Sequence, residues 1–320
     1  MRRLLAALSL TAIAAVSVYA QAVRVDTAIA PYARSSGVSG NINSVGSDTM
    51  NNLMALWGES FQKLYPNVKI QIEGKGSTTA PPALIAGTSQ FGPMSRAMKP
   101  TEIDQFEKKY GYKPTAIRTS YDALAVWVNK DNPLDKLTLA QVDAIFSKAR
   151  KRGNRSDVKT WGQLGLTGDW ANRPISLYGR NSASGTYGFF KEHVMVNGDY
   201  KDTVKEQPGS ASVVQGVTED RFGIGYSGIG YRTSGVKALT LADKDGAFFD
   251  GSYANVTGGK YPLWRFLYLY VNKAPGKPLD PLVKEFVKLI LSREGQEVVV
   301  KDGYLPLTPA IVKEELAKLD

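Results

Sequence analysis

The sequence predicts an α/β protein built on largely parallel sheets, and three observations lead to this fold class. Short apolar runs that suit buried strands alternate along the chain with segments whose apolar residues recur at helical spacing. The turns from strand to helix carry glycine and small hydroxyl residues, which are typical of helix starts. The chain has 320 residues, of which 43% are hydrophobic, so it is long enough for two domains with ordinary cores. Strands that alternate with helices in this way favour parallel pairing through crossover connections.

The first half of the chain begins with a Ser-, Ala- and Gly-rich arm at 23–40 and then alternates strand and helix. Ser47 or Asp48 is expected to cap the first helix, because a side-chain oxygen there can accept hydrogen bonds from the free amides of the first turn. Thr138 is expected to cap a later helix for the same reason. The expected strands lie at 41–45, 68–72 and 123–128, and the expected helices at about 48–65, 101–110 and 138–146.

The second half of the chain continues the alternation. The run 223–228 matches the glycine pattern of a dinucleotide site, but polar residues precede it rather than a buried strand, so a nucleotide site is disfavoured. We interpret Trp161 and Trp170 as core or loop-anchoring residues rather than as parts of an interface. Strands are expected at 175–178, 224–226 and 264–271, and helices after residue 184 and at 281–291 and 309–319.

The N-terminus has the three parts of a secretory signal at 1–22. Two arginines precede an apolar stretch at 4–18 that is too short for a membrane span, and cleavage is expected after Ala20 or Ala22. A buried first helix is the alternative. The chain has 0 cysteines, so it has neither a disulfide nor a cysteine that could accept a lipid. We therefore expect a periplasmic protein exported by a cleaved signal peptide, and not a lipoprotein.

The formal net charge of +10 suits an anionic partner without identifying one. Nucleic acid is the obvious rival, but the basic residues are spread through the chain and the predicted signal indicates export. The one dense basic run, at 148–155, is interpreted as a solvated loop. No nucleic-acid partner is therefore expected.

The segment 180–190 is the most informative part of the chain, because it combines an arginine with a glycine-containing helix start. Arg180 offers a planar fork of N–H donors that suits a tetrahedral oxyanion. Ser184 and Thr186 add small hydroxyl donors, and Gly185 lets a ligand approach the backbone closely. The free amides and the dipole of a helix start also favour an anion. An ordinary Ser-capped helix beside a surface arginine is the alternative.

Turns of this type recur around Ser47, Ser77, Ser95 and Ser184. Any one of them is explained by plain capping. Ligands of open α/β sheets bind at the carboxyl ends of strands, where such turns lie. Four turns that each follow a strand therefore indicate donors that converge on one small oxyanion.

In these motifs the chain resembles the periplasmic phosphate-binding proteins of ABC phosphate importers, the PstS-type family. The resemblance covers about 41–310, and the Arg-x-x-x-Ser-Gly-Thr spacing at 180–186 is its most specific part. It implies a class II two-domain periplasmic binding protein, hinged by two crossover strands, with the ligand in the interdomain cleft. The motifs that carry it are GSDT at 46–49, GKGS at 74–77, FGPMSR at 91–96, YGR at 178–180, SGT at 184–186 and GIGY at 223–226.

The resemblance also implies a set of phosphate contacts. In the family, the Arg-x-x-x-Ser-Gly-Thr residues and the serine after the Gly-x-Gly turn contact phosphate, and the first helix start adds a threonine and the next amide. Two positions depart from this pattern, because Asp48 stands where a threonine is expected and Ser95 stands where an aspartate accepts the phosphate proton. A one-residue shift of these turns would bring in Ser47 or Arg96. The expected phosphate-binding residues are Ser47, Asp48, Thr49, Ser77, Ser95, Arg180, Ser184, Gly185 and Thr186.

The two departures from the family pattern, at Asp48 and Ser95, suggest how the chain selects its anion. A carboxylate that accepts the proton of phosphate disfavours sulfate, which carries no proton near neutral pH. Our hypothesis is that this carboxylate has moved from the position of Ser95 to Asp48. The alternative is that Asp48 only caps its helix.

The resemblance further implies the organisation and role of the whole protein. The first domain would be discontinuous, with 41–120 joined by 262–320, and the second domain would be 121–261. The implied function is high-affinity binding of inorganic phosphate in the periplasm and its delivery to an ABC permease in the inner membrane. The protein is expected to be monomeric.

Other functions remain open at this point. Sulfate or arsenate could replace phosphate in a site of this kind, and an exported phosphatase or an attachment protein could use the same fold. An enzyme needs a nucleophile with a base, or metal ligands. The only histidine is His193, which we interpret as a structural or surface residue, and the chain has no Gly-x-Ser-x-Gly motif. We therefore expect binding without catalysis, with no metal and no other cofactor.

Overall fold

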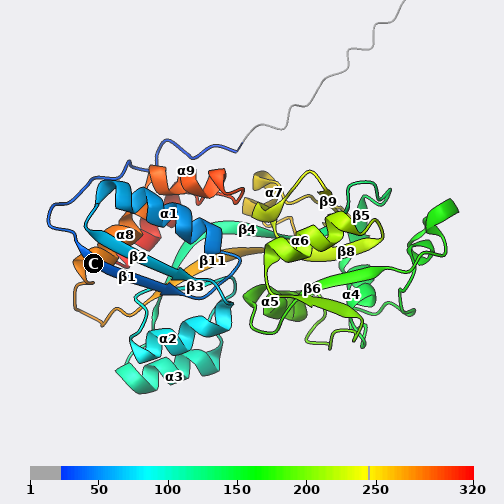
Figure 1. Ribbon diagram of the computed structural model, residues 1–320, viewed down its shortest axis with the longest axis horizontal. Helices are drawn as coiled ribbons and strands as arrows, with labels where there is room; N and C mark the ends of the chain where they lie inside the picture. Colours follow the sequence, from blue (N-terminus) through cyan, green and yellow to red (C-terminus); the bar gives the residue numbers. More distant parts are fainter. Residues whose placement is uncertain (1–22, 244–245) are drawn as a thin grey trace, which may run out of the picture.

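The computed structural model describes residues 23–243 and 246–320, so the predicted signal at 1–22 lies outside the described residues. The chain forms two lobes that lie side by side, with strands running between them (Figure 1). The first lobe holds the N-terminal elements together with the C-terminal helices, and the second lobe holds the middle of the chain. None of the helices in the described part is both long and apolar enough to cross a membrane.

The first lobe is built on short parallel strands covered by helices (Figure 1). Its elements are β1 (Gly40–Val45), α1 (Asn51–Leu64), β2 (Val68–Glu73), α2 (Ala80–Ala86), β3 (Gly92–Met94), α3 (Pro100–Tyr110), α8 (Pro281–Leu291), α9 (Arg293–Lys301) and α10 (Pro309–Ala317). β1 and β2 pair in parallel, in a register that sets Gly40 opposite Val68. A bridge from Ser44 to Phe91 places the start of β3 beside the end of β1. The strand ends that carry the hydroxyl turns therefore lie close together.

The second lobe repeats this arrangement with its own parallel strands. Its elements are β5 (Lys136–Thr138), α4 (Leu139–Phe146), β6 (Ser176–Arg180), α5 (Gly185–His193), β7 (Val204–Gln207), α6 (Ser210–Glu219), β8 (Gly223–Gly228), β9 (Val236–Ala238), β10 (Thr240–Ala242) and α7 (Tyr253–Thr257). β6 pairs in parallel with both β7 and β8, and β5 pairs in parallel with β10. The end of β6 leads directly to the start of α5, where the sequence predicts the anion site.

Two long strands connect the lobes, β4 (Thr115–Asn129) and β11 (Trp264–Val271). They are antiparallel to each other, and they join the strands of both lobes in the order β3-β11-β4-β8-β6-β7, with β9 also paired to β4. The expectation of largely parallel sheets is therefore correct within each lobe and wrong for these two strands. The chain leaves the first lobe along β4 and returns along β11, so the two strands must run in opposite directions.

Each lobe has its own aromatic core. In the first lobe, the indole N–H of Trp57 on α1 donates to Gly295 O at 2.8 Å, and the Phe61 ring meets Phe286 edge to face. These contacts hold α1 against α8 and α9. The helical spacing of the apolar residues in this stretch thus produced one buried face.

The second lobe packs its aromatic residues in two places. Phe190 stacks on Tyr226 with ring centroids 3.9 Å apart, which fixes α5 against β8. Trp161 and Trp170 meet edge to face at 5.8 Å, and both are buried. The interpretation of these two tryptophans as core residues is confirmed.

The two predicted helix caps have different outcomes. Thr138 caps α4, because its Oγ1 accepts from the amide of Gln141 and the Gln141 side chain accepts from the amide of Thr138 in return. The first helix begins only at Asn51, and no side chain caps it. The prediction that Ser47 or Asp48 is the cap is therefore wrong, because the turn extends three residues further before the helix begins.

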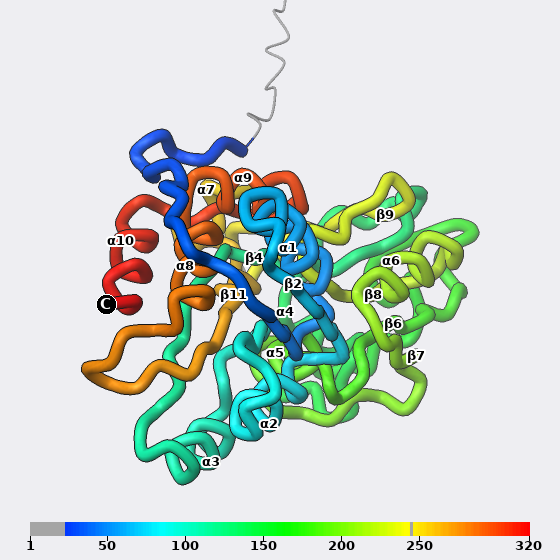
Figure 2. Tube along the Cα trace, turned by 60° about the vertical axis from the view of Figure 1, so that its left-hand side comes forward, coloured from blue at the N-terminus to red at the C-terminus, as the bar shows by residue number. Residues whose placement is uncertain are grey.

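The N-terminal arm at 23–40 runs over α8 and α9 of the first lobe (Figure 2). The amide of Arg293 donates to Ala30 O at 2.9 Å, and the amide of Tyr32 donates to a Glu294 carboxylate oxygen at 2.7 Å. The arm is thus a packed part of the first lobe rather than a loose linker.

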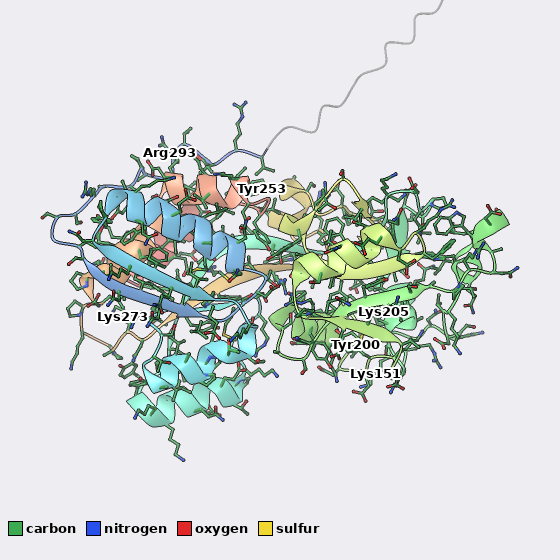
Figure 3. All side chains as sticks on the ribbon, viewed as in Figure 1. Lys151, Tyr200, Lys205, Tyr253, Lys273 and Arg293 are labelled. Carbon is green, nitrogen blue, oxygen red and sulfur yellow. The ribbon has the colours of Figure 1, made fainter. Side chains whose placement is uncertain are left out.

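Basic side chains are distributed over both lobes, as Figure 3 shows for Lys273 on one and Lys151 and Lys205 on the other. Lys151 belongs to the dense basic run, where Lys148 and Arg155 are also exposed. The interpretation as a solvated loop holds for these three residues, whereas Arg152 is held by Asp243 and by Val194 O.

Candidate anion-binding site

The residues that the sequence predicts for an anion site gather where the two lobes meet. Direct contacts between the lobes connect them, and we call this group the donor cluster. The first lobe contributes Ser47, Asp48, Thr49, Ser77 and Ser95, and the second lobe contributes Arg180, Ser184, Gly185 and Thr186.

Arg180 ends β6, and it is only 1% exposed. Its Nη1 donates to Ser210 Oγ at 2.7 Å, and its Nη2 donates to Pro208 O at 3.2 Å and lies 3.1 Å from Asp48 Oδ2 of the other lobe. Burial lowers the pKa of the Arg180 guanidinium, and the Asp48 carboxylate opposes that shift. Nε has no hydrogen-bond partner among the described residues. One N–H of this buried cation is thus available to a ligand.

Ser184 is the cap of α5. Its Oγ accepts from the amides of Thr186 at 3.1 Å and Tyr187 at 3.3 Å. The two capping hydrogen bonds therefore occupy both lone pairs of the Ser184 hydroxyl, and its hydrogen can still be donated to a ligand.

Gly185 brings α5 against the first lobe more closely than any other residue could. A Cβ at this position would lie 2.3 Å from Ser77 Oγ and 2.7 Å from Ser95 Oγ, which is too close for real atoms. These two hydroxyls are fully buried and 3.2 Å apart, and Ser77 Oγ accepts from the amide of Ser95 at 3.0 Å. Glycine is needed here because the backbone of one lobe faces the hydroxyl groups of the other.

The turn before α1 supplies two further hydroxyls. Thr49 Oγ1 lies 2.9 Å from Thr186 Oγ1, so a hydrogen bond crosses between the lobes. Tyr304 holds the turn in place by donating to Thr49 O at 2.8 Å. Ser47 Oγ is buried and has no hydrogen-bond partner in the described part of the chain.

Asp48 is the residue of this turn that reaches furthest across the junction. Its Oδ2 accepts from the amide of Ser210 at 2.8 Å and pairs with Arg180. The carboxylate therefore bonds to the second lobe and not to its own helix, which is why it does not cap α1.

Arg96, which a one-residue shift of its turn would have brought into the site, lies outside the donor cluster. It forms a two-pronged ion pair with Glu102, with N–O distances of 2.8 and 2.7 Å. Ser95 and not Arg96 is the residue of that turn that contacts the cluster.

Sequence reasoning missed two residues of this junction, Arg265 on β11 and Asp122 on β4. Both are buried, and Arg265 Nη2 lies 2.7 Å from Asp122 Oδ2. Arg265 also donates to Ser95 O at 2.7 Å and to Thr186 Oγ1 at 2.9 Å. A signal was present for Arg265, which is the lone charged residue of an otherwise apolar strand, but not for Asp122, because β4 also contains Arg118.

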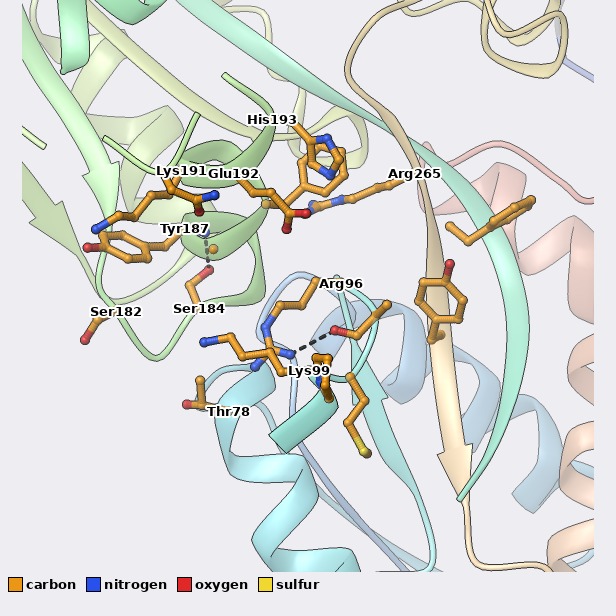
Figure 4. Close-up of a pocket in the computed structure, with 18 of the residues that line it drawn as sticks. Thr78, Arg96, Lys99, Ser182, Ser184, Tyr187, Lys191, Glu192, His193 and Arg265 are labelled. Atoms are coloured by element: carbon orange, nitrogen blue, oxygen red, sulfur yellow. Dashed lines mark hydrogen bonds between the residues drawn. The ribbon is translucent and has the colours of Figure 1, made fainter. Parts of the chain in front are cut away.

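A groove of about 890 Å³ opens beside the donor cluster (Figure 4). Ser184 and Arg265 of the junction line its inner part. Its lining carries both signs of charge, because Lys99 and Lys191 lie on it together with Glu192, and Arg96 is paired with Glu102.

His193 lies at the end of α5, on the wall of the groove and not in the donor cluster. Its ring packs on Phe189 with centroids 4.1 Å apart, and burial lowers the pKa of the imidazole. Part of the side chain is exposed to solvent, so His193 is a surface residue with one packed ring face.

The chemistry of the cluster is that of hydrogen-bond donation to an anion. Hydroxyl groups, a guanidinium N–H and the starts of α1 and α5 converge, and the carboxylates of Asp48 and Asp122 are both engaged by arginines. Within 23–243 and 246–320, no group of three or more His, Cys, Asp or Glu residues is placed to hold a metal ion.

Comparison with known sequences finds related proteins that align with most of this chain. Residues 32–294 match the model of the PBP superfamily domain. The phosphate-binding protein PstS of Pseudomonas aeruginosa PAO1 is 58% identical over 319 residues, which cover 99% of this chain and 98% of that protein. The phosphate-binding protein PstS of Staphylococcus haemolyticus is 29% identical, with 88% of this chain and 86% of that protein covered.

Solved structures share the architecture. A candidate phosphate ABC transporter substrate-binding protein from Clostridium perfringens, with bound phosphate, superimposes with a TM-score of 0.71 at 25% identity and covers 84% of this chain and 100% of its own. An ABC-type phosphate transport receptor from Vibrio cholerae gives a TM-score of 0.65 at 22% identity, over 83% of this chain and 100% of its own. The predicted fold class, a two-domain α/β periplasmic binding protein, is confirmed.

Proposed function

Because the chain belongs to the PstS-type phosphate-binding proteins of the PBP superfamily, we propose that it binds inorganic phosphate with high affinity and delivers it to an ABC permease. The relatives are named for phosphate, and a protein of this fold carries bound phosphate in its crystal structure. The proposed compartment is the periplasm, reached through a cleaved signal and without a lipid anchor. The permease would lie in the inner membrane.

The observation that carries this function is the convergence of buried donors from both lobes. Arg180 Nε and Ser47 Oγ are buried polar atoms without partners among the described residues, and such groups are costly to leave unsatisfied. A tetrahedral oxyanion offers acceptors in several directions at once. Bound in the cluster, it would also lie at the starts of α1 and α5, where the helix dipoles favour negative charge.

The anion would be held by hydrogen bonds more than by net charge. Each buried arginine of the junction is matched by an aspartate, Arg180 by Asp48 and Arg265 by Asp122. The two pairs together carry no net charge. The hydroxyls of residues such as Thr49 and Ser77 would therefore supply much of the binding through their geometry, which suits recognition of one anion shape.

We also propose that the two lobes are domains that close over the ligand. The first domain would comprise 41–120 with 262–320, the second would be 121–261, and β4 and β11 would form the hinge. Contacts between the lobes support this, such as the amide of Thr78 donating to Ala183 O at 3.2 Å. A ligand that touches both lobes binds the closed form better and so increases its population.

The protein would bind without catalysis, as a monomer and without a nucleic-acid partner. A hydrolase needs a base beside a nucleophile. The carboxylates nearest the hydroxyls already pair with arginines, and His193 lies in the groove outside the cluster.

The function is tested by calorimetric titration of the mature, ligand-free protein with phosphate, sulfate and arsenate, and by a phosphatase assay on the same sample. We expect one phosphate per chain, weaker sulfate binding and no hydrolysis of a phosphomonoester. Tighter binding of sulfate would overturn the ligand, and turnover that copurifies with the binding activity would overturn the non-catalytic role.

Closure is tested by small-angle scattering with and without phosphate. We expect a smaller radius of gyration when phosphate is bound. Tight binding with an unchanged radius would mean either that closure is absent or that the free protein is already closed.

A further inference from the structure

Arg265 and Asp122 form a buried ion pair on the two strands that connect the lobes. They are direct partners in the antiparallel register of β11 and β4. Arg265 Nε and Nη2 donate to Asp122 Oδ2 at 2.9 and 2.7 Å, and Asp122 Oδ1 accepts from the amide of Ile229 at 3.1 Å. The Phe189 ring lies below the guanidinium at 5.1 Å. The position of Arg265 is thus fixed from several sides.

The remaining contacts of Arg265 reach both walls of the donor cluster. Nη1 donates to Ser95 O of the first lobe at 2.7 Å. Nη2 donates to Thr186 Oγ1 of the second lobe at 2.9 Å. A cation that only had to neutralise Asp122 would need neither contact.

The contact to Thr186 determines how a chain of hydroxyls is oriented. A guanidinium can donate but never accept, so Thr186 Oγ1 must be the acceptor from Arg265. Thr186 Oγ1 also lies 2.9 Å from Thr49 Oγ1. The hydrogen bond between the two hydroxyls uses one of their two hydrogens, so one hydrogen remains whichever hydroxyl donates. A hydroxyl that accepts from a cation becomes a stronger donor, so Arg265 favours Thr186 as the donor to Thr49, and the hydrogen of Thr49 is left to be donated away from the pair.

We propose that Arg265 is a positioning residue that orients the Thr186–Thr49 pair, so that the pair presents a hydrogen rather than lone pairs to the bound anion. Arg265 acts without touching the anion. It orients the pair before the ligand arrives, and it strengthens the outgoing hydrogen bond, because hydrogen bonds in a chain polarise one another. The inference rests on the proposed binding of phosphate in the donor cluster.

If the Arg265–Asp122 pair is purely structural, a different result is expected. Such a pair would stabilise the β4–β11 connection, and its loss would weaken phosphate binding by the same factor whether or not residue 49 carries a hydroxyl. Arg265 and Thr49 are bridged by Thr186, so an energetic coupling between them indicates the hydroxyl chain.

The test is a double-mutant cycle on phosphate affinity with Arg265→Lys and Thr49→Val, measured by calorimetry on the full mature protein. Lysine keeps the charge but cannot serve Asp122, Ser95 and Thr186 from one planar fork. We expect Arg265→Lys to weaken binding about tenfold in the wild-type background and less than about threefold in the Thr49→Val background. Thr49→Ser restores the hydroxyl and should restore the tenfold effect.

Equal losses in the wild-type and the Thr49→Val backgrounds would overturn the inference. Thermal melts of each variant show whether it is folded. If Arg265→Lys does not fold, the cycle is repeated with the neutral pair Asp122→Asn/Arg265→Gln, since replacing both partners of a buried pair is tolerated better than breaking it. Failure of the wild-type protein to bind phosphate would refute the proposed function itself, whereas additive losses in a protein that binds would refute only the role of Arg265.

Discussion

Asp48 and Arg180 come from opposite lobes and approach to 3.1 Å between Oδ2 and Nη2. The same Oδ2 accepts from the amide of Ser210, and Arg180 Nη1 donates to the Ser210 hydroxyl. One aspartate thereby holds both the arginine of the donor cluster and the start of α6. The pair is buried on the arginine side and partly exposed on the aspartate side, with 1% and 21% of the side-chain surface accessible.

Arg180→Ala should weaken phosphate binding by at least about thirtyfold, because losing one partner of a buried, hydrogen-bonded charge pair commonly costs about 2–5 kcal/mol. The variant also removes the N–H that has no partner among the described residues. Calorimetry measures the loss. Arg155→Ala is the matched control, because that arginine is exposed on the basic loop, and it should bind normally. Near-normal affinity of the Arg180 variant would remove this residue from the site.

Asp48→Asn should lower the ratio of phosphate to sulfate affinity by about tenfold. Oδ2 is engaged by Ser210 and Arg180, and Oδ1 accepts no hydrogen bond from the described residues. Oδ1 is thus an acceptor that could receive the proton of phosphate, and losing that acceptor costs roughly 1–3 kcal/mol. Parallel titrations with the two anions measure the ratio. If both affinities change by the same factor, Asp48 positions Arg180 and does not sense the proton.

Gly185→Ala should abolish measurable closure and weaken phosphate binding by at least about thirtyfold. The new methyl group would lie 2.3 Å from Ser77 Oγ, so the lobes could not approach as they do. Gly188→Ala on the same helix is the control, because its methyl group would meet Arg96 Cδ at 3.5 Å, an ordinary contact. That control should bind phosphate normally and gain up to about 1 kcal/mol in stability. Equal behaviour of the two variants would show that the close approach at Gly185 is not needed.

Asp302 should make the stability of the fold depend on pH. Burial raises its pKa to about 6, while the hydrogen bond from Asn52 opposes the shift. Between about pH 4 and pH 6 the folded state keeps a proton that the unfolded chain releases. The contribution of protonated Asp302 to the free energy of unfolding is therefore complete below the pKa of this residue in the unfolded chain. It is lost as the pH rises through about 6.

Asp302→Asn removes this titration. Thermal melts from about pH 4 to pH 8 should show the variant more stable than wild type at neutral pH, with the difference vanishing toward pH 4. Asp104→Asn, at an exposed site on α3, is the control and should follow the wild-type profile. A constant offset between wild type and the Asp302 variant across this range would refute the buried titration.

Local patterns were sufficient for most elements and for the recurrence of hydroxyl turns at the ends of strands. The strand at 264–271 and the helix at 281–291 have the predicted bounds, because their periodicity and boundary residues are contained in one short segment. The same holds for the turn from Arg180 to Thr186, whose spacing depends only on the geometry of one helix start. These features come from neighbouring residues, so the sequence alone was enough to predict them.

Tertiary structure decided which of these groups meet. Asp48 looked like a helix cap because a local acceptor usually bonds to its own helix, but its partners lie at Arg180 and Ser210, more than a hundred residues away. Arg265 gave only the weak signal of a charge in an apolar strand, and its pairing with Asp122 follows from the register of β11 against β4. Pairing of this kind depends on how distant strands align and how the lobes close, and no local periodicity contains that information.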